Sequence, residues 1–575
     1  MTNRTALARM QAAVDPHALQ RHLEWFSGVP RDTGAEGEDR AAAYLAAELD
    51  SAGVPVTVHQ FDAFLSYPRQ ASLRVTSPAT HAFPCVTHSF ARSTAPEGLA
   101  AGLVLVEGSR FAEARGKVAL VDGLATPVTI LQASQAGCAG IIFANEDRVI
   151  HNMIGTTIWG TPGLDQLDRL PTVAAVSVNV ESGAALKAML AAGGPVQTVM
   201  TTAVETGWYR SKLPEVRIPG LREPERFVLV GAHYCAWHEG VTDNATGDAC
   251  VLEMAKLLWK ARVHLGRSVR LCWWPGHSHG RYSGSTWYAD TFFNDLAEGG
   301  LAYYNIDSPG VKGATVYYCR HTCAELEGYC RSVIASVTGQ AGAPVFRPMR
   351  AADQSFLASG MPSFSAYPFL PDGHPDKRPW TGGCANAWWW HTEHDTLDKA
   401  DVSILATDVK VGLEAVWGLT NADSLPVDYR ATAKELLDAV SGFQAKAAGV
   451  DFEPLLADAR VLMQALDRFD ARRPGADAHR DDIDRWNATA MRLGRILNPV
   501  MYTRGGRFHH DPAEWSPILR ATKRFTLPGL NAAEGLAQLA GQPEAGFLKA
   551  QLAREANRAR TAVRDAIRQL GDEPS

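Results

Sequence analysis

The feature that most restricts the fold of this chain is a set of three predicted strands. Each of them ends at a histidine or an aspartate. Short apolar runs occupy residues 227–230, 269–274 and 301–306, and each has the length and composition of a buried parallel strand. The first run is followed by His233, the second by His277 and His279, and the third by Asp307. Since ligands of open α/β sheets gather at the carboxyl ends of the strands, the pattern predicts an α/β fold with a polar site at that edge.

Two further side chains extend this set. Asp243 directly precedes residues 245–260, whose apolar side chains recur at helical spacing, so we expect Asp243 on the loop that enters a helix. Far downstream, His391 follows the tryptophan triplet 388–390. Neutral imidazoles and carboxylates are the ligands that zinc and similar divalent ions take, and a bridging carboxylate can hold two such ions. The sequence therefore predicts a divalent metal site.

The order of the short motifs around these residues resembles the two-zinc aminopeptidase and glutamate carboxypeptidase family. The motifs are His233-Tyr, Thr242-Asp-Asn-Ala-Thr-Gly, Trp274 followed by Gly284-Ser, Asn305-Ile-Asp, and His391-Thr-Glu-His-Asp-Thr-Leu-Asp. The resemblance implies that His233 and Asp307 bind one metal ion, that His391 binds the other, and that Asp243 bridges both. It implies one or two divalent metal ions per chain. Zinc is the expected metal, with iron, manganese or cobalt as alternatives.

The chain departs from that family where the catalytic chemistry lies. The family has two adjacent glutamates, a general base followed by a metal ligand, whereas this chain reads Gly276-His-Ser-His-Gly. Alignment on Gly284-Ser places His277 at the base and Ser278 at the ligand, although His279 could occupy either place. A second departure is Cys235, which stands where the family has an acid that orients the first histidine.

Three functions remain open after this departure. One is a metal-dependent hydrolase of an amide or peptide-like bond, in which His277 or His279 is the catalytic histidine. A second is a different metal-dependent reaction, such as deamination or decarboxylation. The third is a binding protein without catalysis, as in the transferrin receptor, a relative that has lost its metal site.

Candidate substrate contacts surround the predicted metal site. Asp353 lies in a stretch resembling the family's pocket wall, and it could bind substrate, support a ligand or cap a helix. Trp390 stands where carboxypeptidase-like members carry a tyrosine that binds the oxyanion, and Ser278 is a third candidate. Lys377 and Arg378 are candidate cations for a substrate anion.

The pattern of apolar runs, glycine turns and helical periodicity along the chain predicts four segments. Residues 1–84 and 204–425 are expected to form a split catalytic domain with a zinc-peptidase-like mixed sheet flanked by helices. Residues 85–203 carry short strands between glycine turns and resemble the inserted, β-rich protease-associated domain. Residues 426–575 show helical periodicity and resemble the C-terminal helical dimerisation domain of glutamate carboxypeptidase and transferrin receptor, so we expect a homodimer.

Composition excludes several classes of partner. The formal net charge of the 575 residues is −6, without a basic run, so nothing favours nucleic acid as a partner. The sequence shows neither a secretory signal nor a continuous apolar segment of membrane-spanning length, so we expect a soluble, cytoplasmic protein without a membrane partner. The nine cysteines, scattered through apolar runs, are expected to be reduced core thiols. The expected partner is a small-molecule or peptide-like substrate.

Overall fold

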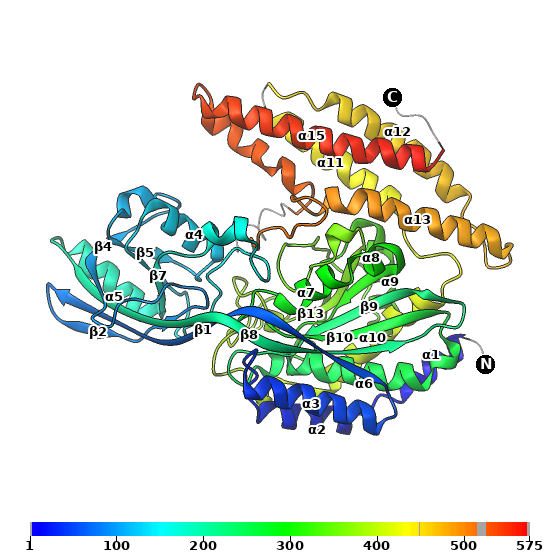
Figure 1. The fold of residues 1–575 in the computed structure, drawn as a ribbon, viewed down its shortest axis with the longest axis horizontal. Coiled ribbons are helices and arrows are strands. Elements are labelled where there is room, and N and C mark those ends of the chain that lie inside the picture. Colours follow the sequence, from blue (N-terminus) through cyan, green and yellow to red (C-terminus); the bar gives the residue numbers. More distant parts are fainter. Residues whose placement is uncertain (1–2, 448, 515–524, 572–575) are drawn as a thin grey trace.

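One mixed sheet runs through the protein and joins its two β-containing parts. The computed structural model describes residues 3–447, 449–514 and 525–571, and within them the sheet order is β12-β13-β11-β9-β10-β8-β4-β5-β6-β7-β3, with β1 paired to β8 and β2 paired to β1 (Figure 1). The strands are β1 (Val56–Ser77), β2 (His81–Phe83), β3 (Val86–Thr87), β4 (Leu99–Leu105), β5 (Val118–Asp122), β6 (Gly140–Ala144), β7 (Ala174–Val178), β8 (Gln197–Ile218), β9 (Glu223–His233), β10 (Arg267–Trp274), β11 (Gly300–Asn305), β12 (Val316–Arg320) and β13 (Ser363–Phe369).

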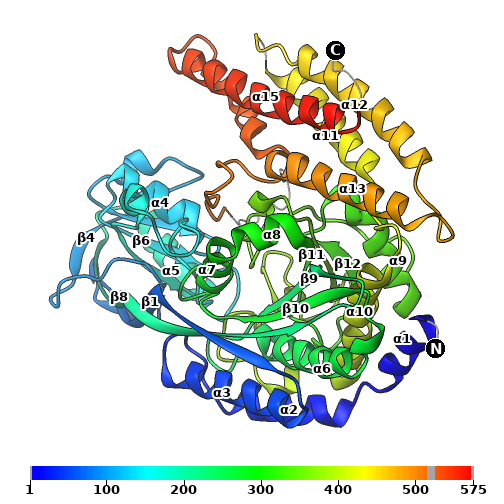
Figure 2. The same cartoon turned by 45° about the vertical axis from the view of Figure 1, so that its right-hand side comes forward.

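The central part of this sheet has helices on both faces. Strand β9 pairs in parallel with β10 and β11, and β11 pairs in parallel with β13. The helices of the first 425 residues are α1 (Asn3–Ala12), α2 (Pro16–Ser27), α3 (Glu36–Ser51), α4 (Pro127–Ala136), α5 (Val180–Ala191), α6 (Thr246–Lys260), α7 (Ser283–Thr291), α8 (Phe293–Gly299), α9 (Glu327–Thr338) and α10 (Val402–Asn421). Helices α2, α3, α6 and α10 cover one face, and α7 and α8 cover the other (Figures 1 and 2).

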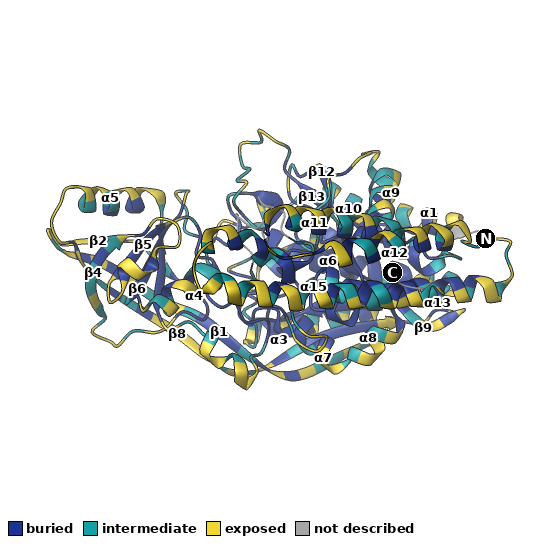
Figure 3. Cartoon of the chain, turned by 90° about the horizontal axis from the view of Figure 1, so that it is seen from above, coloured by how far each residue is buried: buried dark blue, intermediate teal, exposed yellow. Residues whose placement is uncertain are grey.

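The alternation of side chains along β9 shows why this strand lies in the middle. Val228 and Val230 belong to the apolar cluster that includes α6 and α10, whereas Phe227 and Leu229 belong to the cluster beneath α7 and α8. All four are buried, because a strand covered on both faces buries every side chain. Figure 3 shows buried residues gathered in the interior of the molecule, between its exposed helical surfaces. The predicted α/β class, with a mixed sheet between helices, is confirmed.

The segment between β2 and β8 forms a separate lobe at one end of the sheet (Figure 1). The predicted short strands are present as β4 to β7, which pair in parallel with one another. This lobe is less purely β than expected, because α4 and α5 also lie in it. The long strands β1 and β8 pair along nearly their whole length and connect the lobe to the central sheet.

The C-terminal segment is helical, as the apolar periodicity predicts. Its described helices are α11 (Tyr429–Lys446), α12 (Glu453–Ala471), α13 (Arg480–Met501) and α15 (Glu544–Gln569). Helix α15 packs against α12 and α13, and Arg495 of α13 donates hydrogen bonds to the carbonyl oxygens of Ala297 and Gly360. These bonds fix α13 to helix α8 and to the turn that precedes β13.

Two observations bear on the compositional predictions. Across the described ranges, the helices are all too short or too polar to cross a lipid bilayer. The nine cysteines are free thiols, and all of them except the half-buried Cys85 are buried. The protein core therefore holds these thiols away from solvent.

Candidate metal centre and its pocket

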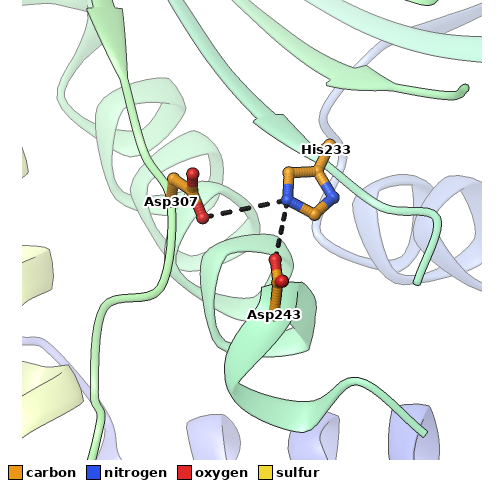
Figure 4. Close-up of side chains that lie close together, drawn as sticks. All are labelled: His233, Asp243 and Asp307. Atoms are coloured by element: carbon orange, nitrogen blue, oxygen red, sulfur yellow. Dashed lines mark ion pairs between the residues drawn. The ribbon is translucent and has the colours of Figure 1, made fainter. Parts of the chain in front are cut away.

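Four predicted ligands from distant parts of the chain meet at the carboxyl edge of the sheet. His233 is the last residue of β9, Asp307 follows β11, and Asp243 lies on the loop before α6. His233 Nε2 is 3.0 Å from Asp243 Oδ1 and 3.8 Å from Asp307 Oδ1 (Figure 4). His391 Nε2 lies 3.3 Å from the other oxygen of Asp243, Oδ2. Asp243 thus stands between two imidazoles, which is the position predicted for a bridging ligand.

The arrangement of these side chains fits a divalent cation. The ligand atoms of His233, Asp243 and Asp307 all lie within 4.8 Å of one another. His233 Nδ1 donates to the carbonyl oxygen of Cys235 at 3.0 Å, and His391 Nδ1 donates to that of Asn152 at 2.7 Å. Each ring therefore presents Nε2 to the carboxylates, and His233 Nε2 is buried without a well-aligned hydrogen bond. Metal-binding histidines are expected to have this orientation, with Nδ1 bonded to a backbone carbonyl and Nε2 facing the other ligands.

The pKa shifts of His233 and Asp243 also indicate that a cation belongs between these side chains. Burial alone would lower the pKa of His233, but Asp243 and Asp307 raise it well above its ordinary value. Burial would raise the pKa of Asp243, yet His233 and His391 hold it well below its usual range. Two buried carboxylates are stable only with positive charge between them, which a bound metal ion would provide and which a protonated His233 provides without it.

Hydrogen bonds from a second layer of residues fix the loop that carries Asp243. Asp395 Oδ2 accepts the backbone N–H of Asp243 at 2.9 Å, and Asp395 Oδ1 accepts the N–H and hydroxyl of Thr242. Asn244 receives the N–H of Ser308 and donates to the carbonyl of Ile306, which ties this loop to the end of β11. These supporting roles leave no sequence signal beyond the motifs themselves.

His277 lies in the site, and Asp353 is its partner. His277 stacks on His233 with ring centroids 3.9 Å apart, and its Nδ1 lies 2.7 Å from Asp353 Oδ2. The other oxygen of Asp353 accepts the hydroxyl of Ser285 at 2.9 Å. Asp353 is only 1% exposed, with both oxygens occupied by protein groups, so the structure does not support the predicted contact with substrate. It instead orients an imidazole whose pKa is lowered by burial and by His233.

The hydrogen bonds behind Asp353 continue into the inserted lobe. Ser285 Oγ lies 2.9 Å from Ser355 Oγ, which accepts the indole N–H of Trp159 at 2.8 Å. Trp159 also packs against Tyr282, whose ring contacts His277 edge-on at 4.9 Å. The inserted lobe therefore supports both His277, through Trp159, and His391, through Asn152.

The structure does not bring His279 to the metal cluster. The loop after β10 folds back, with the N–H groups of Gly280 and Tyr282 both bonded to the carbonyl of Gly276. His277 and His279 consequently leave the loop in different directions, and His279 Nε2 faces Asp32 at 3.5 Å while its ring packs on Trp237 at 4.4 Å. His279 is therefore not among the residues that line the metal pocket, and this position does not support its predicted catalytic role.

Ser278 and Trp390 have different surroundings from each other. Ser278 is buried outside the pocket, and its carbonyl accepts the hydroxyl of Ser89, so it supplies neither the missing ligand nor a substrate contact. Trp390 does line the pocket and stacks on His391 with centroids 4.0 Å apart. Its ring passes so close to Gly383 that a Cβ there would lie 2.5 Å from the indole nitrogen. The absence of a side chain at Gly383 therefore leaves room for Trp390 to stack on His391.

A partly enclosed cavity opens onto these groups. Its polar lining consists of Asp243, His277, Arg281, Asp307, Arg320 and His391, and its apolar lining includes Met153, Ile154 and Trp390. Arg281 and Arg320 were missed from the sequence, because an isolated arginine carries no pattern. The predicted cations Lys377 and Arg378 are instead paired with Asp372 and Asp147, each at 2.7 Å.

Comparisons with known proteins relate part of this chain to metallopeptidases. The sequence model of peptidase family M28 matches residues 216–414. The chain is 26% identical over 364 residues to the probable glutamate carboxypeptidase VP8 of Zea mays, a match that covers 50% of each protein. The chain thus spans about half the length of this curated relative.

Solved structures show the same fold. An aminopeptidase from Aneurinibacillus sp. strain AM-1 superposes with a TM-score of 0.56 at 19% identity, covering 72% of this chain and 95% of that one. A zinc aminopeptidase from Bacillus subtilis gives a TM-score of 0.55 at 19% identity, covering 70% and 95%.

These findings define the class of protein. Residues 216–414 form an M28-like metallopeptidase domain, in which the mixed sheet carries the cluster of candidate ligands His233, Asp243 and Asp307. The matched family and the His/Asp ligand set together support a divalent metal as its cofactor.

Proposed function

We propose that this protein is a metal-dependent hydrolase that cleaves an amide or peptide-like bond in a small substrate, with His277 in place of the usual acidic base. One observation carries the proposal: His277, paired with the buried Asp353, lines the cavity together with the candidate ligands Asp243, Asp307 and His391. A site that had simply decayed would have no reason to keep a buried, hydrogen-bonded dyad beside those ligands.

The residues of the chain have separate tasks in this reaction. A divalent ion held by His233, Asp243 and Asp307 would supply an activated water and polarise the scissile carbonyl. His277 accepts a proton at Nε2, because its Nδ1 faces Asp353. The carboxylate of Asp353 stabilises the imidazolium that forms, as an acid behind a catalytic histidine does in other hydrolases. The cavity walls, including Trp390, exclude water around the substrate.

We further propose zinc as the metal and one tightly bound ion per chain. His233, Asp243 and Asp307 supply three ligands, which leaves the open position of a catalytic zinc site. A second ion would have Asp243 Oδ2 and His391 Nε2 but no acid at position 278. Loss of that carboxylate weakens the binding of a second ion, because carboxylate charge offsets the cost of bringing another divalent cation into the cavity.

The direct experiment combines metal analysis with turnover. Purified protein would be analysed for bound metal by mass spectrometry and assayed with aminoacyl 4-nitroanilides and N-acetyl dipeptides, before and after chelation. We expect about one zinc ion per chain, and amide cleavage that is lost on chelation and restored by zinc. The matched variants are His277→Ala, which should abolish cleavage while keeping the metal, and His81→Ala, an exposed histidine on β2 that should change neither.

Two outcomes would replace this proposal with the alternatives. Metal-dependent turnover of other substrates, without amide cleavage, would favour deamination or decarboxylation. A protein that binds no metal after exposure to zinc, manganese, iron or cobalt would be a binding protein. Equal cleavage by wild type and His277→Ala would remove the histidine from the reaction.

We also propose that the C-terminal helices mediate a homodimer and that the inserted lobe corresponds to a protease-associated domain. The helices α11, α12, α13 and α15 form a layer on one side of the sheet, and Phe547 on α15 exposes most of its ring. Light scattering of the full chain tests the first proposal, since a monomeric mass at micromolar concentration would reject it.

A further inference from the structure

Two buried arginines line the metal pocket. Arg281 lies on the loop after β10, and Arg320 is the last residue of β12. Arg281 is 4% exposed and Arg320 is 6% exposed, and both side chains border the cavity that contains Asp243, Asp307 and His277. A guanidinium group stays charged in proteins, so each brings a positive charge into a site that is largely removed from water.

Neither guanidinium group has its donors satisfied by the described protein. The buried Nε of Arg281 has no hydrogen-bond acceptor, and no described carboxylate forms an ion pair with its side chain, which packs over the ring of Tyr282 at 4.8 Å. Arg320 donates from Nη2 to the carbonyl of Gly382 at 2.8 Å and packs over Tyr367, but its buried Nη1 has no acceptor. An unpaired buried charge costs several kcal/mol, on the order of what removing one partner of a buried pair costs.

Arginines that serve the fold in this protein look different. Arg31, which is fully buried, donates to the carbonyl oxygens of Phe26, Tyr234 and Gly240. Arg267, which is equally buried, forms an ion pair with Glu223 at 2.7 Å. These two structural guanidinium groups are bonded to the protein, whereas Arg281 and Arg320 line the cavity with donors that no described acceptor satisfies, which points to a ligand.

The charge of the pocket indicates the sign of that ligand. The carboxylates lining the cavity are Asp243 and Asp307, whose two negative charges equal those of one divalent ion. The neighbouring Asp353 is engaged with His277 and Ser285. With the metal bound, the charges of Arg281 and Arg320 remain without counterions in the cavity lining.

We propose that Arg281 and Arg320 form a subsite for a carboxylate of the substrate, so that the protein acts on a small acid with a second polar group at the metal. This inference rests on the proposed function for the position of the substrate, but the subsite itself is a property of the two arginines. A planar guanidinium group with free N–H donors matches the geometry of a carboxylate. The partly enclosed lining of the cavity suits a small molecule rather than a folded partner.

The test measures binding and needs no turnover. Zinc-loaded protein would be titrated by calorimetry with succinate, with succinamate, which has the same shape but one carboxylate fewer, and with inorganic phosphate. We expect succinate to bind about 10- to 150-fold more tightly than succinamate, since hydrogen bonds to charged groups contribute about 1.5–3 kcal/mol. Inorganic phosphate should bind more weakly than succinate.

Three variants make the assignment specific. Arg281→Met and Arg320→Met should each reduce the preference for succinate at least fivefold, and Arg281→Lys should retain part of it. Arg74→Met, at an exposed arginine of β1, is the matched control and should keep the full preference. Both neutral variants should also raise the thermal midpoint of the ligand-free protein, because each removes an unpaired buried charge.

The outcomes separate the subsite from the catalytic proposal. Equal binding of succinate and succinamate by wild type would overturn the subsite, and so would an unchanged preference in both arginine-to-methionine variants. Phosphate binding tighter than succinate would overturn the choice of carboxylate. If the preference behaves as expected while no amide is cleaved, the subsite stands and the hydrolase proposal fails.

Discussion

The replacement of Asp353 by asparagine tests how the chain compensates for its missing acids. Asp353 Oδ2 lies 2.7 Å from His277 Nδ1, and its other oxygen accepts the hydroxyl of Ser285 at 2.9 Å. Asparagine keeps the size and most of the packing but removes the negative charge that stabilises a protonated His277. A buried, charge-assisted hydrogen bond contributes about 1.5–3 kcal/mol, so kcat should fall about 10- to 150-fold.

The assay must separate this effect from loss of metal or of folding. We would measure kcat, KM, bound zinc and the thermal midpoint for the wild type, for Asp353→Asn and for Asp408→Asn. Asp408 is a buried carboxylate outside the metal pocket that accepts bonds from Tyr317 and Gly310, and burial raises its pKa to about 7. The account expects Asp353→Asn to lower kcat with unchanged KM and metal content, and Asp408→Asn to leave kcat unaltered. An unaltered kcat in Asp353→Asn with full metal content would refute the role assigned to the pair.

Three further predictions follow from the same structure. Trp159→Phe removes the indole N–H donated to Ser355 and should lower kcat about fivefold, corresponding to about 1 kcal/mol, with zinc content unchanged; a kcat within experimental error of wild type would show that the inserted lobe does not help to position His277. Asp307→Asn should reduce bound zinc well below one ion per chain, which equilibrium dialysis would measure, and retention of the full ion would contradict the ligand assignment. Glu215→Gln should destabilise the fold at pH 7: burial would raise the pKa of Glu215, but bonds from His59, Arg217 and Tyr288 lower it to about 2. Because the folded-state pKa lies below the ordinary value of 4.5, the carboxylate contributes about 3 kcal/mol above pH 4.5, and this contribution is lost as the pH falls towards 2. Urea unfolding at pH 7 and pH 3.5 should therefore show a smaller difference between wild type and variant at the lower pH.

The strands and their polar ends could be predicted from the sequence because each depends on local pattern. Val228 and Val230 belong to a β-branched run that only a buried strand explains, and His233 and Asp307 follow such runs directly. Asp243 could be placed for a related reason, since a helix with clear periodicity begins just after it. Parallel pairing of β9 with β10 and β11 then brings the ends together.

The direction of side chains on the loop after β10 could not be predicted in this way. His277 and His279 are equivalent in a sequence pattern, and the choice between them depends on how the chain folds back on the carbonyl of Gly276. Gly276 itself has a φ of 69°, and a Cβ there would collide with Ser283 Oγ. The turn is thus fixed by contacts that form only when α7 packs against the sheet.

Other contributions to the site depend on contacts between segments distant in the chain. Asn152 holds His391 across 239 positions, and Asp395 holds Asp243 across 152. Arg320 reaches the pocket only because β12 pairs with β13 at the edge of the sheet. No local pattern reports such contacts, which is why the ligands were predictable and their supports were not.

Anomalous X-ray diffraction from zinc-loaded crystals, recorded on both sides of the zinc absorption edge, tests the central claim most directly. The account predicts one strong peak within bonding distance of His233 Nε2 and of carboxylate oxygens of Asp243 and Asp307, with His277 facing it and His279 turned away. A peak elsewhere in the protein, or none at these three side chains in crystals that contain zinc, would contradict it.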